Sequence, residues 1–288
     1  MASLAFIGLG VMGAPMAGHL RAQGHDLAVY NRTRAKAEAW AEEHGGRLAD
    51  SPADAARDAD AVFACVGNDE DLRAITLGPD GAFAAMRPGT LFCDHTTASM
   101  AIAEELGREG AARGLYILDA PVSGGEPGAI KGTLVTMVGG TAEAFAAAKP
   151  YLEAYAARVV HIGPHGAGQG AKMANQLCIA GVLAGVSEAL HLTRKLGLDP
   201  DLVLEAVAGG SGQSWQLENR WPTMARGEFD FGFAVEWMRK DLGLALAAAR
   251  ASGASLPVAA LLDQFYAEVE RLGGRRQDTS SLVRRYEQ

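Results

Sequence analysis

A lysine and an asparagine follow a run of glycines just after the midpoint of the chain. The segment reads GPHGAGQGAKMAN, residues 163–175, and places Lys172 three positions before Asn175. Side chains three residues apart share one face of a helix. A lysine within a small, apolar stretch either extends its ammonium group to solvent or serves a function such as proton transfer. The spacing alone leaves both interpretations open.

A second glycine-rich segment, LYILDAPVSGG, lies upstream. Ser123 supplies a hydroxyl group, and Gly124 and Gly125 leave their backbone N–H groups unobstructed by a side chain. Successive backbone N–H groups of this kind form a concavity that suits a carboxylate. The alternative is an ordinary glycine turn that binds nothing.

The third segment, IGLGVMG, follows the first apolar run of the chain and precedes a helical pattern. Its glycines fit G-x-G-x-x-G, which permits a tight turn, close approach of a pyrophosphate and close packing of helix on sheet. The helix that follows would present its N-terminal N–H groups to phosphates. A glycine turn without a ligand is the alternative. The predicted cofactor-binding residues of this loop are Gly8, Leu9, Gly10, Val11, Met12 and Gly13.

The end of the next apolar run predicts which dinucleotide is bound. An acidic residue at this place would hydrogen-bond the ribose of NAD, but the sequence here is Asn31, Arg32 and Thr33. Arg32 can pair with a 2′-phosphate, assisted by Thr33 and by Arg34. We therefore expect NADP as the preferred cofactor, with NAD as the alternative. In another interpretation Arg32 is solvated and stacks on the adenine.

Short apolar runs separated by helical stretches must position these segments. Such alternation predicts an α/β Rossmann-type domain with a mainly parallel sheet. From about Gly168 onward helical periodicity takes over, and residues 169–196 form one candidate long helix. We expect a dinucleotide-binding domain at residues 1–163 and an all-helical domain at 164–288. The predicted strands are residues 4–8, 27–31, 61–66, 90–96, 115–120, 134–140 and 158–163.

Composition excludes several classes of function. The chain has 288 residues, 49% of them hydrophobic, and a formal net charge of −8. The negative net charge argues against nucleic-acid binding, which requires clustered positive charge. The longest strongly apolar run is about half a membrane span, so we expect a cytoplasmic protein that binds neither membrane nor nucleic acid. No histidine or cysteine spacing predicts a metal site. We interpret the basic stretch from Arg271 to Arg285 as a solvated tail or a subunit contact, with a lid over the site as the alternative.

The three segments together resemble the β-hydroxyacid dehydrogenase family, which includes 3-hydroxyisobutyrate dehydrogenase and tartronate semialdehyde reductase. The resemblance rests on FIGLGVMGAPMAGHL, DAPVSGG, GPHGAGQGAKMAN and KDLGLAL, which follow one another in the family's order. It implies a Rossmann-type domain followed by an all-helical, 6-phosphogluconate dehydrogenase-like domain, a small carboxylate-bearing substrate, and a homodimer or homotetramer. His19 departs from the asparagine usual there, and we expect it to be a substitution on a helix surface.

The resemblance also implies roles for individual residues. Lys172 matches the catalytic lysine of the family. Val66, Gly67, Thr97 and Lys240 match residues that contact the cofactor. Groups that hold the substrate carboxylate and hydroxyl are matched by Ser123, Gly124, Gly125 and Asn175.

The expected reaction is the interconversion of a short β-hydroxy acid and its semialdehyde. The nicotinamide would exchange the hydride, and Lys172 would exchange the proton. Oxidation requires a neutral lysine, so it should be faster at alkaline pH. Alternatives are reduction of tartronate or succinic semialdehyde or of glyoxylate, imine reduction, and a non-catalytic protein that binds NADP.

Overall fold

A nine-stranded sheet organises the first part of the chain in the computed structural model, which describes residues 1–286. The strands run in the order β3-β2-β1-β4-β5-β6-β8-β7, and β9 pairs with β8. The strands β1 to β6 pair in parallel, whereas β8 is antiparallel to β6 and β7. The strands are β1 (Ser3–Ile7), β2 (Asp26–Tyr30), β3 (Arg47–Leu48), β4 (Ala61–Ala64), β5 (Leu91–Asp94), β6 (Tyr116–Asp119), β7 (Val122–Ser123), β8 (Leu134–Gly140) and β9 (Ala156–Gly163).

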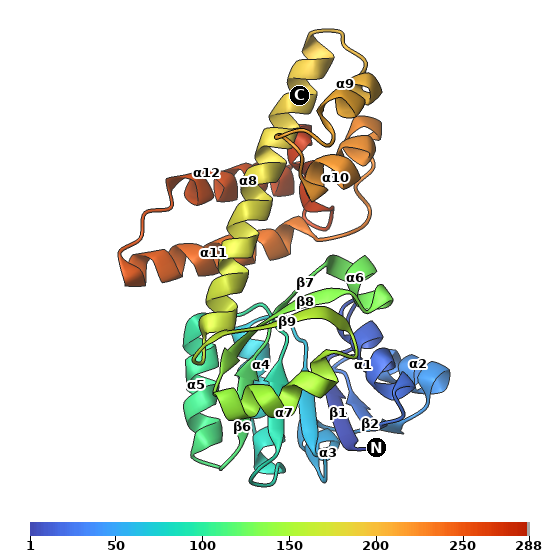
Figure 1. The fold of residues 1–288 in the computed structure, drawn as a ribbon, viewed down its shortest axis with the longest axis vertical. Helices are drawn as coiled ribbons and strands as arrows, with labels where there is room; N and C mark the ends of the chain where they lie inside the picture. The colour runs from blue at the N-terminus through green and yellow to red at the C-terminus, as the bar shows by residue number, and fades with distance from the viewer. Residues whose placement is uncertain (287–288) are drawn as a thin grey trace. The chain divides into compact units, whose positions relative to one another are not determined.

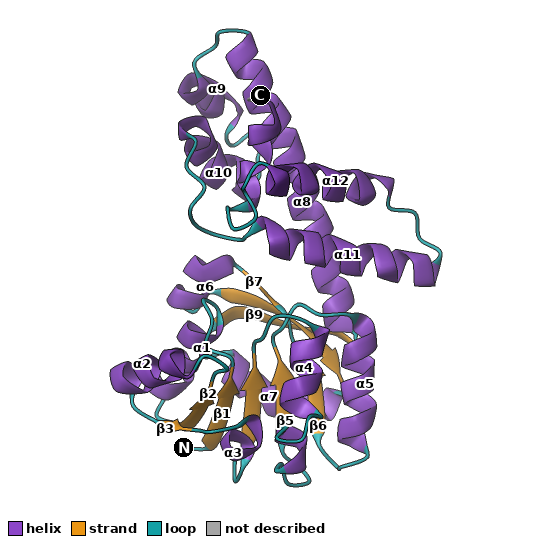
Figure 2. Ribbon diagram, turned by 180° about the vertical axis from the view of Figure 1, so that it is seen from behind, coloured by secondary structure: helices purple, strands orange, loops and turns teal. Residues whose placement is uncertain are grey.

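Helices cover both faces of this sheet (Figures 1 and 2). Side chains of α1, α2 and α7 pack with one face, and those of α3, α4 and α5 pack with the other. The central strands are buried along their whole length, as expected for a parallel sheet covered on both sides. The helices of this part are α1 (Gly13–Ala22), α2 (Arg34–His44), α3 (Pro52–Ala56), α4 (Asp69–Thr76), α5 (Met100–Ala111), α6 (Gly125–Lys131) and α7 (Ala142–Leu152), with a 3₁₀ turn at Ala82–Ala84.

Several helices begin where the sequence supplies a capping side chain. Asn68 accepts the backbone N–H of Asp71 at the start of α4, and Ser99 accepts that of Ile102 at the start of α5. Such a cap satisfies one of the first four N–H groups of a helix, which have no partner within it. These caps fix the N-termini of α4 and α5, which directly follow the loops that carry candidate site residues.

The rest of the chain is helical, and the structure confirms the predicted fold class. The chain divides into two compact units, Met1–Lys172 and Met173–Gln288, at a point inside the long helix α8. The predicted boundary between residues 163 and 164 stays a prediction. The helices are α8 (Ala167–Lys195), α9 (Pro200–Val207), α10 (Trp215–Arg226), α11 (Val235–Ser252) and α12 (Pro257–Arg271), followed by the 3₁₀ segment Thr279–Tyr286.

The core of the second unit forms where α11 and α12 pack with α8 and with the last segment. Met238, Leu242 and Tyr266 are fully buried there, and Trp221 of α10 is buried beside Leu190 of α8. By length and composition α8 could also cross a membrane, but core helices of soluble proteins meet the same criterion. The buried polar side chains at the start of α8 favour a core helix.

The basic C-terminal stretch is not a solvated tail, so that part of the interpretation was wrong, whereas the subunit contact and the lid stay predictions. Leu282 and Val283 are buried, and Arg285 forms an ion pair of 2.5 Å with Glu268 of α12. Its guanidinium also lies 3.4 Å from the centre of the Phe265 ring. Arg284 donates to Gln277 Oε1 and to the Leu272 carbonyl oxygen. The segment therefore packs as part of the helical unit.

Candidate functional site

The glycine loop between β1 and α1 has the geometry that a dinucleotide requires. Gly8 has a φ of +97°, and a side chain there would collide with the Cys65 carbonyl oxygen. A side chain at Gly13 would collide with the Gly8 carbonyl oxygen, whereas one at Gly10 would meet nothing within 4 Å. Two glycines thus allow the tight turn and close packing, and the third leaves open space where a pyrophosphate can approach the backbone.

The N-terminus of α1 can receive the negative charge of such a ligand. No side chain caps this helix, and its first turn holds no acidic residue. The residue after β2 fixes the glycine loop, because Asn31 Oδ1 accepts a hydrogen bond of 2.9 Å from the Leu9 N–H. Helix N-termini favour anions through their N–H groups and their dipole. The residues of this loop therefore fit a dinucleotide phosphate.

The two arginines after β2 are already paired with carboxylates. Arg32 makes an ion pair of 2.6 Å with Asp71 near the start of α4, and 83% of its side chain is exposed. Arg34 contacts Glu38 at 2.9 Å and Asp50 at 2.7 Å. Asn31 donates to the Thr33 carbonyl oxygen at 2.9 Å, which orders the loop between the strand and α2. The Arg32 guanidinium lies at the surface, where it can exchange Asp71 for a phosphate.

The remaining candidate cofactor residues of the first unit follow neighbouring parallel strands. Val66 and Gly67 come after β4, and Thr97 comes after β5. The Val66 N–H donates a hydrogen bond of 3.0 Å to Thr96 Oγ1, which joins the two loops. Carboxyl ends of parallel strands meet at one edge, so these loops lie beside the glycine loop after β1. The order 3-2-1-4-5-6 reverses direction between β1 and β4, where such folds bind dinucleotides.

The Ser-Gly-Gly turn comes after β6, and its serine ends the short strand β7. Ser123 belongs to β7 and pairs with Val135 of β8, while Gly124 and Gly125 have φ angles of +131° and +62°. Both glycines are exposed, and α6 begins at Gly125. Only glycine adopts successive angles of this kind without strain, so the turn presents bare backbone at the start of a helix.

From the sequence we expected His19 to be a substitution on a helix surface, but in the structure it also links two helices. Its Nε2 lies 2.9 Å from the Ala129 carbonyl oxygen and 3.1 Å from that of Ile130, both in α6. Because a carbonyl only accepts, Nε2 carries the proton and donates. His19 thus ties α1, behind the glycine loop, to α6, which follows the Ser-Gly-Gly turn.

Lys172 lies on the second turn of α8, in a buried setting. Only 8% of the residue is exposed, which argues against a lysine that extends to solvent. Two glutamines of α8 are also buried, Gln169 three residues before Lys172 and Gln176 four residues after it. This spacing places all three polar side chains on one helix face.

Gln176 was not predicted as a site residue. In the second unit its Nε2 donates a hydrogen bond of 2.6 Å to Asp241 Oδ2, and its Oε1 accepts one of 2.8 Å from Asn175. Asp241 is buried on α11 and lies 3.3 Å from the Lys240 ammonium group. The candidate residues Asn175 and Lys240 therefore belong to one polar network. Its sequence signal was a glutamine four residues after Lys172 in an apolar run.

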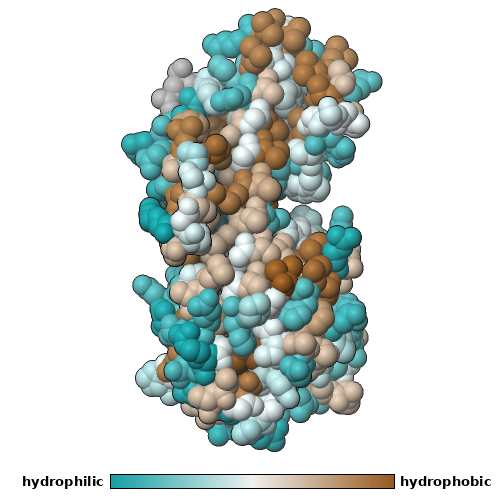
Figure 3. Space-filling model, turned by 60° about the vertical axis from the view of Figure 1, so that its left-hand side comes forward, coloured by the Kyte–Doolittle hydropathy of each residue, from teal (hydrophilic) through white to brown (hydrophobic). Residues whose placement is uncertain are grey.

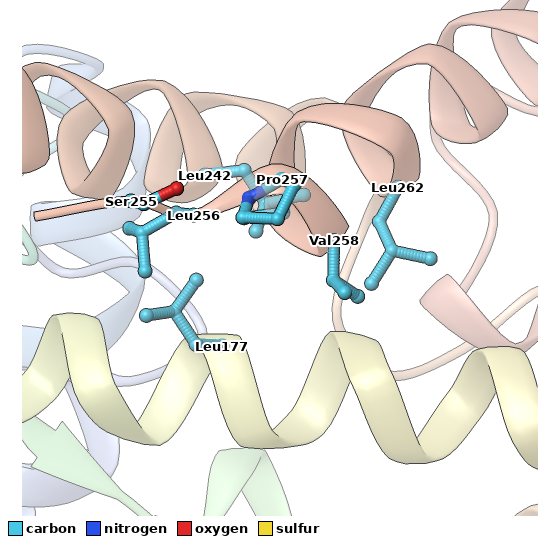
Figure 4. Close-up of a pocket in the computed structure, with 8 residues that line it drawn as sticks. Leu177, Leu242, Ser255, Leu256, Pro257, Val258 and Leu262 are labelled. Atoms are coloured by element: carbon cyan, nitrogen blue, oxygen red, sulfur yellow. The ribbon is translucent and has the colours of Figure 1, made fainter.

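The cavity of the second unit is not suited to a carboxylate. It has a volume of about 220 Å³ and lies where the start of α12 faces α8 and α11 (Figure 4). Ser255 is the one polar residue among those that line it, which are Leu177, Leu242, Ser255, Leu256, Pro257, Val258, Ala259 and Leu262. Within residues 1–286, no group of three or more histidine, cysteine or acidic side chains could hold a metal ion.

Two family models match the chain in succession. Residues 3–163 match the NAD binding domain of 6-phosphogluconate dehydrogenase, and residues 166–286 match the NAD-binding domain of NADP-dependent 3-hydroxyisobutyrate dehydrogenase. The chain belongs to the β-hydroxyacid dehydrogenase family. The family and its NAD(P)-binding domains were both predicted from the sequence motifs, and both predictions are confirmed.

Curated members of the β-hydroxyacid dehydrogenase family match the chain over nearly its whole length. An uncharacterized oxidoreductase of Shewanella frigidimarina is 54% identical over 100% of this chain and 99% of its own. The 3-hydroxyisobutyrate dehydrogenase of Pseudomonas aeruginosa is 40% identical over 92% and 91%. The NAD-dependent L-serine dehydrogenase of the same organism is 37% identical over 100% and 98%.

Solved structures of the family share the fold. A 3-hydroxyisobutyrate dehydrogenase of Mycobacterium tuberculosis, solved with L-serine, has a TM-score of 0.90 and 34% identity, with 100% of both chains covered. Psf3 in complex with NADP⁺ and 2-OPP has a TM-score of 0.88 and 28% identity, with 97% and 98% covered. The chain is thus an oxidoreductase of the 3-hydroxyisobutyrate dehydrogenase type, whose relatives differ in substrate.

Proposed function

We propose that this chain is an NADP-preferring dehydrogenase or reductase that interconverts a short β-hydroxy acid and its semialdehyde, with Lys172 as general acid and base. The observation that carries the proposal is the burial of Lys172, one turn beyond a helix start that is anchored to the dinucleotide-binding unit. A buried lysine on a polar helix face is suited to proton exchange with a bound substrate.

The names of relatives support the substrate class. One relative is a 3-hydroxyisobutyrate dehydrogenase, another is an L-serine dehydrogenase, and one neighbouring structure contains L-serine. Both compounds carry a hydroxyl group on the carbon β to a carboxylate. A site that recognises this pair of groups needs an anion-binding turn and a proton-exchanging group, for which Ser123 to Gly125 and Lys172 are the candidates.

The residues of the chain would divide the reaction as follows. Nicotinamide, when bound, supplies or accepts the hydride. In reduction, protonated Lys172 donates a hydrogen bond to the carbonyl oxygen and passes its proton to that oxygen as negative charge develops. In oxidation, neutral Lys172 accepts the hydroxyl proton. The Ser123 hydroxyl and the N–H groups of Gly124 and Gly125 would hold the carboxylate, and Asn175 would orient the reacting hydroxyl.

The cofactor preference rests on Arg32. A guanidinium pairs with a 2′-phosphate, and the loop offers no carboxylate of its own at the end of β2 for a ribose diol. One neighbouring structure of the family holds NADP⁺. We therefore propose NADP as the preferred cofactor of this chain.

Steady-state kinetics test the proposal directly. Oxidation of 3-hydroxyisobutyrate, L-serine and other short β-hydroxy acids, and reduction of their semialdehydes, are measured with NADP(H) and NAD(H). We expect turnover with a short β-hydroxy acid, a higher kcat/KM with NADP(H), and loss of turnover in Lys172→Ala. Absence of turnover across this panel would overturn the proposed substrate class. If the protein reduced imines but none of these compounds, the proposed function would change to imine reduction.

A further inference from the structure

The carboxylate of Asp119 binds the start of α8, although the two are far apart in the sequence. Asp119 ends β6 and is 3% exposed. Its Oδ1 accepts a hydrogen bond of 2.8 Å from the Gly166 N–H, and its Oδ2 accepts one of 2.9 Å from the Gln169 N–H. The first N–H groups of a helix have no partner within it. This carboxylate satisfies two N–H groups at the start of α8, although it lies 47 and 50 residues earlier.

The Gln169 side chain joins the same helix start to the loop after β5. Its Nε2 donates a hydrogen bond of 2.7 Å to the Thr96 carbonyl oxygen, and its Oε1 accepts one of 3.0 Å from the Ala98 N–H. The amide is 1% exposed, so water does not compete for these bonds. Thr96 in turn accepts the Val66 N–H. The loops after β4 and β5 are thus linked to α8 by one chain of hydrogen bonds.

Backbone packing leaves the Asp119 carboxylate little freedom. A side chain at Gly168 would collide with the Met137 carbonyl oxygen of β8, and it would lie 2.7 Å from the Asp119 carbonyl oxygen and 2.8 Å from Asp119 Oδ2. A side chain at Gly139 would also collide with the carboxylate. Two residues further along α8, a side chain at Gly170 would meet the end of the Met100 side chain at ordinary van der Waals distance, with Sδ at 3.5 Å and Cε at 3.8 Å. The glycines next to Asp119 therefore hold the helix start close to β6 and β8.

An acidic group is well suited to this position. A carboxylate accepts hydrogen bonds with both oxygens, whereas an amide would turn an N–H₂ group toward one of the two N–H donors. Negative charge also interacts favourably with the positive end of the helix dipole. Burial raises the pKa of the Asp119 carboxyl, and its hydrogen bonds from Gly166 and Gln169 oppose that rise.

We infer that Asp119 and Gln169 are positioning residues that fix Lys172 for proton transfer. This inference rests on the proposed function. Lys172 follows Gln169 by three residues in the same helix, so displacement of the helix start displaces the Lys172 ammonium group. A shift of about 1 Å in a reacting group can cost about 100-fold in rate. Neither Asp119 nor Gln169 needs to touch the substrate for this effect.

A matched pair of glycine substitutions tests the inference. Gly168→Ala and Gly170→Ala both raise helix propensity in the first turn of α8, but only Gly168→Ala crowds the Asp119 carboxylate. We expect Gly168→Ala to lower kcat at least tenfold with little change in the Kd of NADPH, and Gly170→Ala to keep the wild-type kcat. Equal kcat values in the two variants would overturn the inference.

Two nearly isosteric variants test the hydrogen bonds themselves. Asp119→Asn replaces one acceptor oxygen with a donor, and Gln169→Glu replaces the donor to Thr96 with an oxygen. We expect kcat to fall at least tenfold in each variant. In Gln169→Glu the pH midpoint of kcat, which reports the Lys172 proton, should also rise, because a carboxylate then lies one turn from the lysine. Hydrogen exchange of the peptide spanning residues 163–172 should become faster. Wild-type kcat together with faster exchange would show that the anchor does not position Lys172.

Chemical labelling separates this inference from the proposed function. The rate at which acetic anhydride modifies Lys172 is measured by mass spectrometry in the cofactor-free protein, which requires no substrate. We expect slow labelling in the wild type and in Gly170→Ala, and faster labelling in Asp119→Asn and Gly168→Ala. If no substrate turns over but labelling follows this pattern, the anchor stands and the proposed function falls. If the wild type turns over a substrate, and the variants show wild-type labelling and turnover, the proposed function stands and the anchor falls.

Discussion

Arg32 and Asp71 form an ion pair of 2.6 Å between the loop after β2 and the first turn of α4. A 2′-phosphate at the end of β2 must compete with this carboxylate for the guanidinium. Because 83% of the Arg32 side chain is exposed, the pair is worth only about 0.2–1 kcal/mol. We therefore expect Asp71 to weaken NADP binding without preventing it.

The first prediction concerns that competition. Asp71→Asn should lower the Kd of NADP by about 1.5- to 5-fold, which corresponds to the free energy of an exposed ion pair. The Kd of NAD should change less, because NAD has no phosphate at this position. Fluorescence titration of the variant with NADPH and NADH measures both values.

The matched control is Arg32→Ala, which removes the guanidinium and leaves Asp71 in place. We expect it to raise the Kd of NADP by about tenfold or more, as for a lost charge-assisted hydrogen bond. A rise in the Kd of NADP in Asp71→Asn would mean that the carboxylate holds Arg32 ready for the phosphate instead of competing with it.

The second prediction concerns proton transfer. Lys172→Ala should lower kcat by about 10²- to 10⁴-fold, the range typical of general acid and base catalysis, while the Kd of NADPH stays near the wild-type value. Wild-type oxidation should accelerate from neutral to alkaline pH, since Lys172 accepts a proton only when it is neutral. Steady-state rates from pH 6 to pH 10, measured in both directions, check this expectation.

A second lysine of α8 provides the control for that experiment. Lys195 lies in the last turn of the same helix and is exposed. Lys195→Ala should leave kcat and its pH dependence unchanged. Near-normal turnover in Lys172→Ala would remove this residue from the mechanism.

Local patterns were sufficient to predict most of the first unit. Each of the seven predicted strands corresponds to a strand of the structure, because each combines an apolar run with flanking turn residues. The two missed strands, Arg47–Leu48 and Val122–Ser123, have two residues each and are defined only by their neighbours in the sheet. The long helix was predicted at 169–196 and observed at Ala167–Lys195.

Long-range contacts could not be predicted in the same way. The roles of Asp119 and Gln169 depend on partners 47 to 73 residues away, which no local pattern reveals. Likewise, the pairing of Arg32 with Asp71 is visible only once α4 is placed beside the loop after β2. Sequence motifs thus predicted candidate residues for the chemistry, but not the residues that hold those candidates in place.

The third prediction concerns assembly. We propose that the chain forms a homodimer or homotetramer through its helical unit, where apolar side chains gather at the surface (Figure 3). Leu192 of α8, Leu202 of α9 and Leu261 of α12 are 57%, 64% and 51% exposed. Clusters of exposed apolar residues often mark interfaces. Leu202→Glu should therefore lower the molar mass measured by light scattering after size-exclusion chromatography.

An exposed apolar residue of the other unit serves as the control for assembly. Ile130 of α6 is 59% exposed, and Ile130→Glu should keep the wild-type mass. A monomeric wild type at micromolar concentration would contradict the proposal, whatever the variants do.

The fourth prediction concerns acid stability and starts from a buried histidine after β5. His95 is 2% exposed; its Nδ1 lies 2.7 Å from the Ala120 carbonyl oxygen, and its Nε2 lies 2.8 Å from the Tyr155 hydroxyl oxygen. Since the carbonyl only accepts, Nδ1 carries the proton and Nε2 accepts from Tyr155. A second proton would charge a ring that is shielded from water, and this burial lowers the pKa of His95 from 6.5 to about 4.

The sign of the effect follows from which state binds the proton more tightly. Between pH 6.5 and pH 4 the unfolded chain binds a proton at His95 that the folded chain does not. The contribution of His95 to the free energy of unfolding is therefore fully present above pH 6.5 and falls as pH is lowered, by about 1.4 kcal/mol per unit and about 3 kcal/mol in all. Urea unfolding at half-unit steps from pH 7.5 to pH 4 measures this slope.

Two variants separate this effect from the titration of carboxylates. His95→Gln cannot titrate, so its free energy of unfolding should fall less steeply over the same interval than that of the wild type. Tyr155→Phe keeps His95 and removes one hydrogen bond, so it should lose about 1 kcal/mol and retain most of the slope. If the slopes of wild type and His95→Gln coincide, the pKa of His95 is the same in the folded and unfolded protein, and the prediction is wrong.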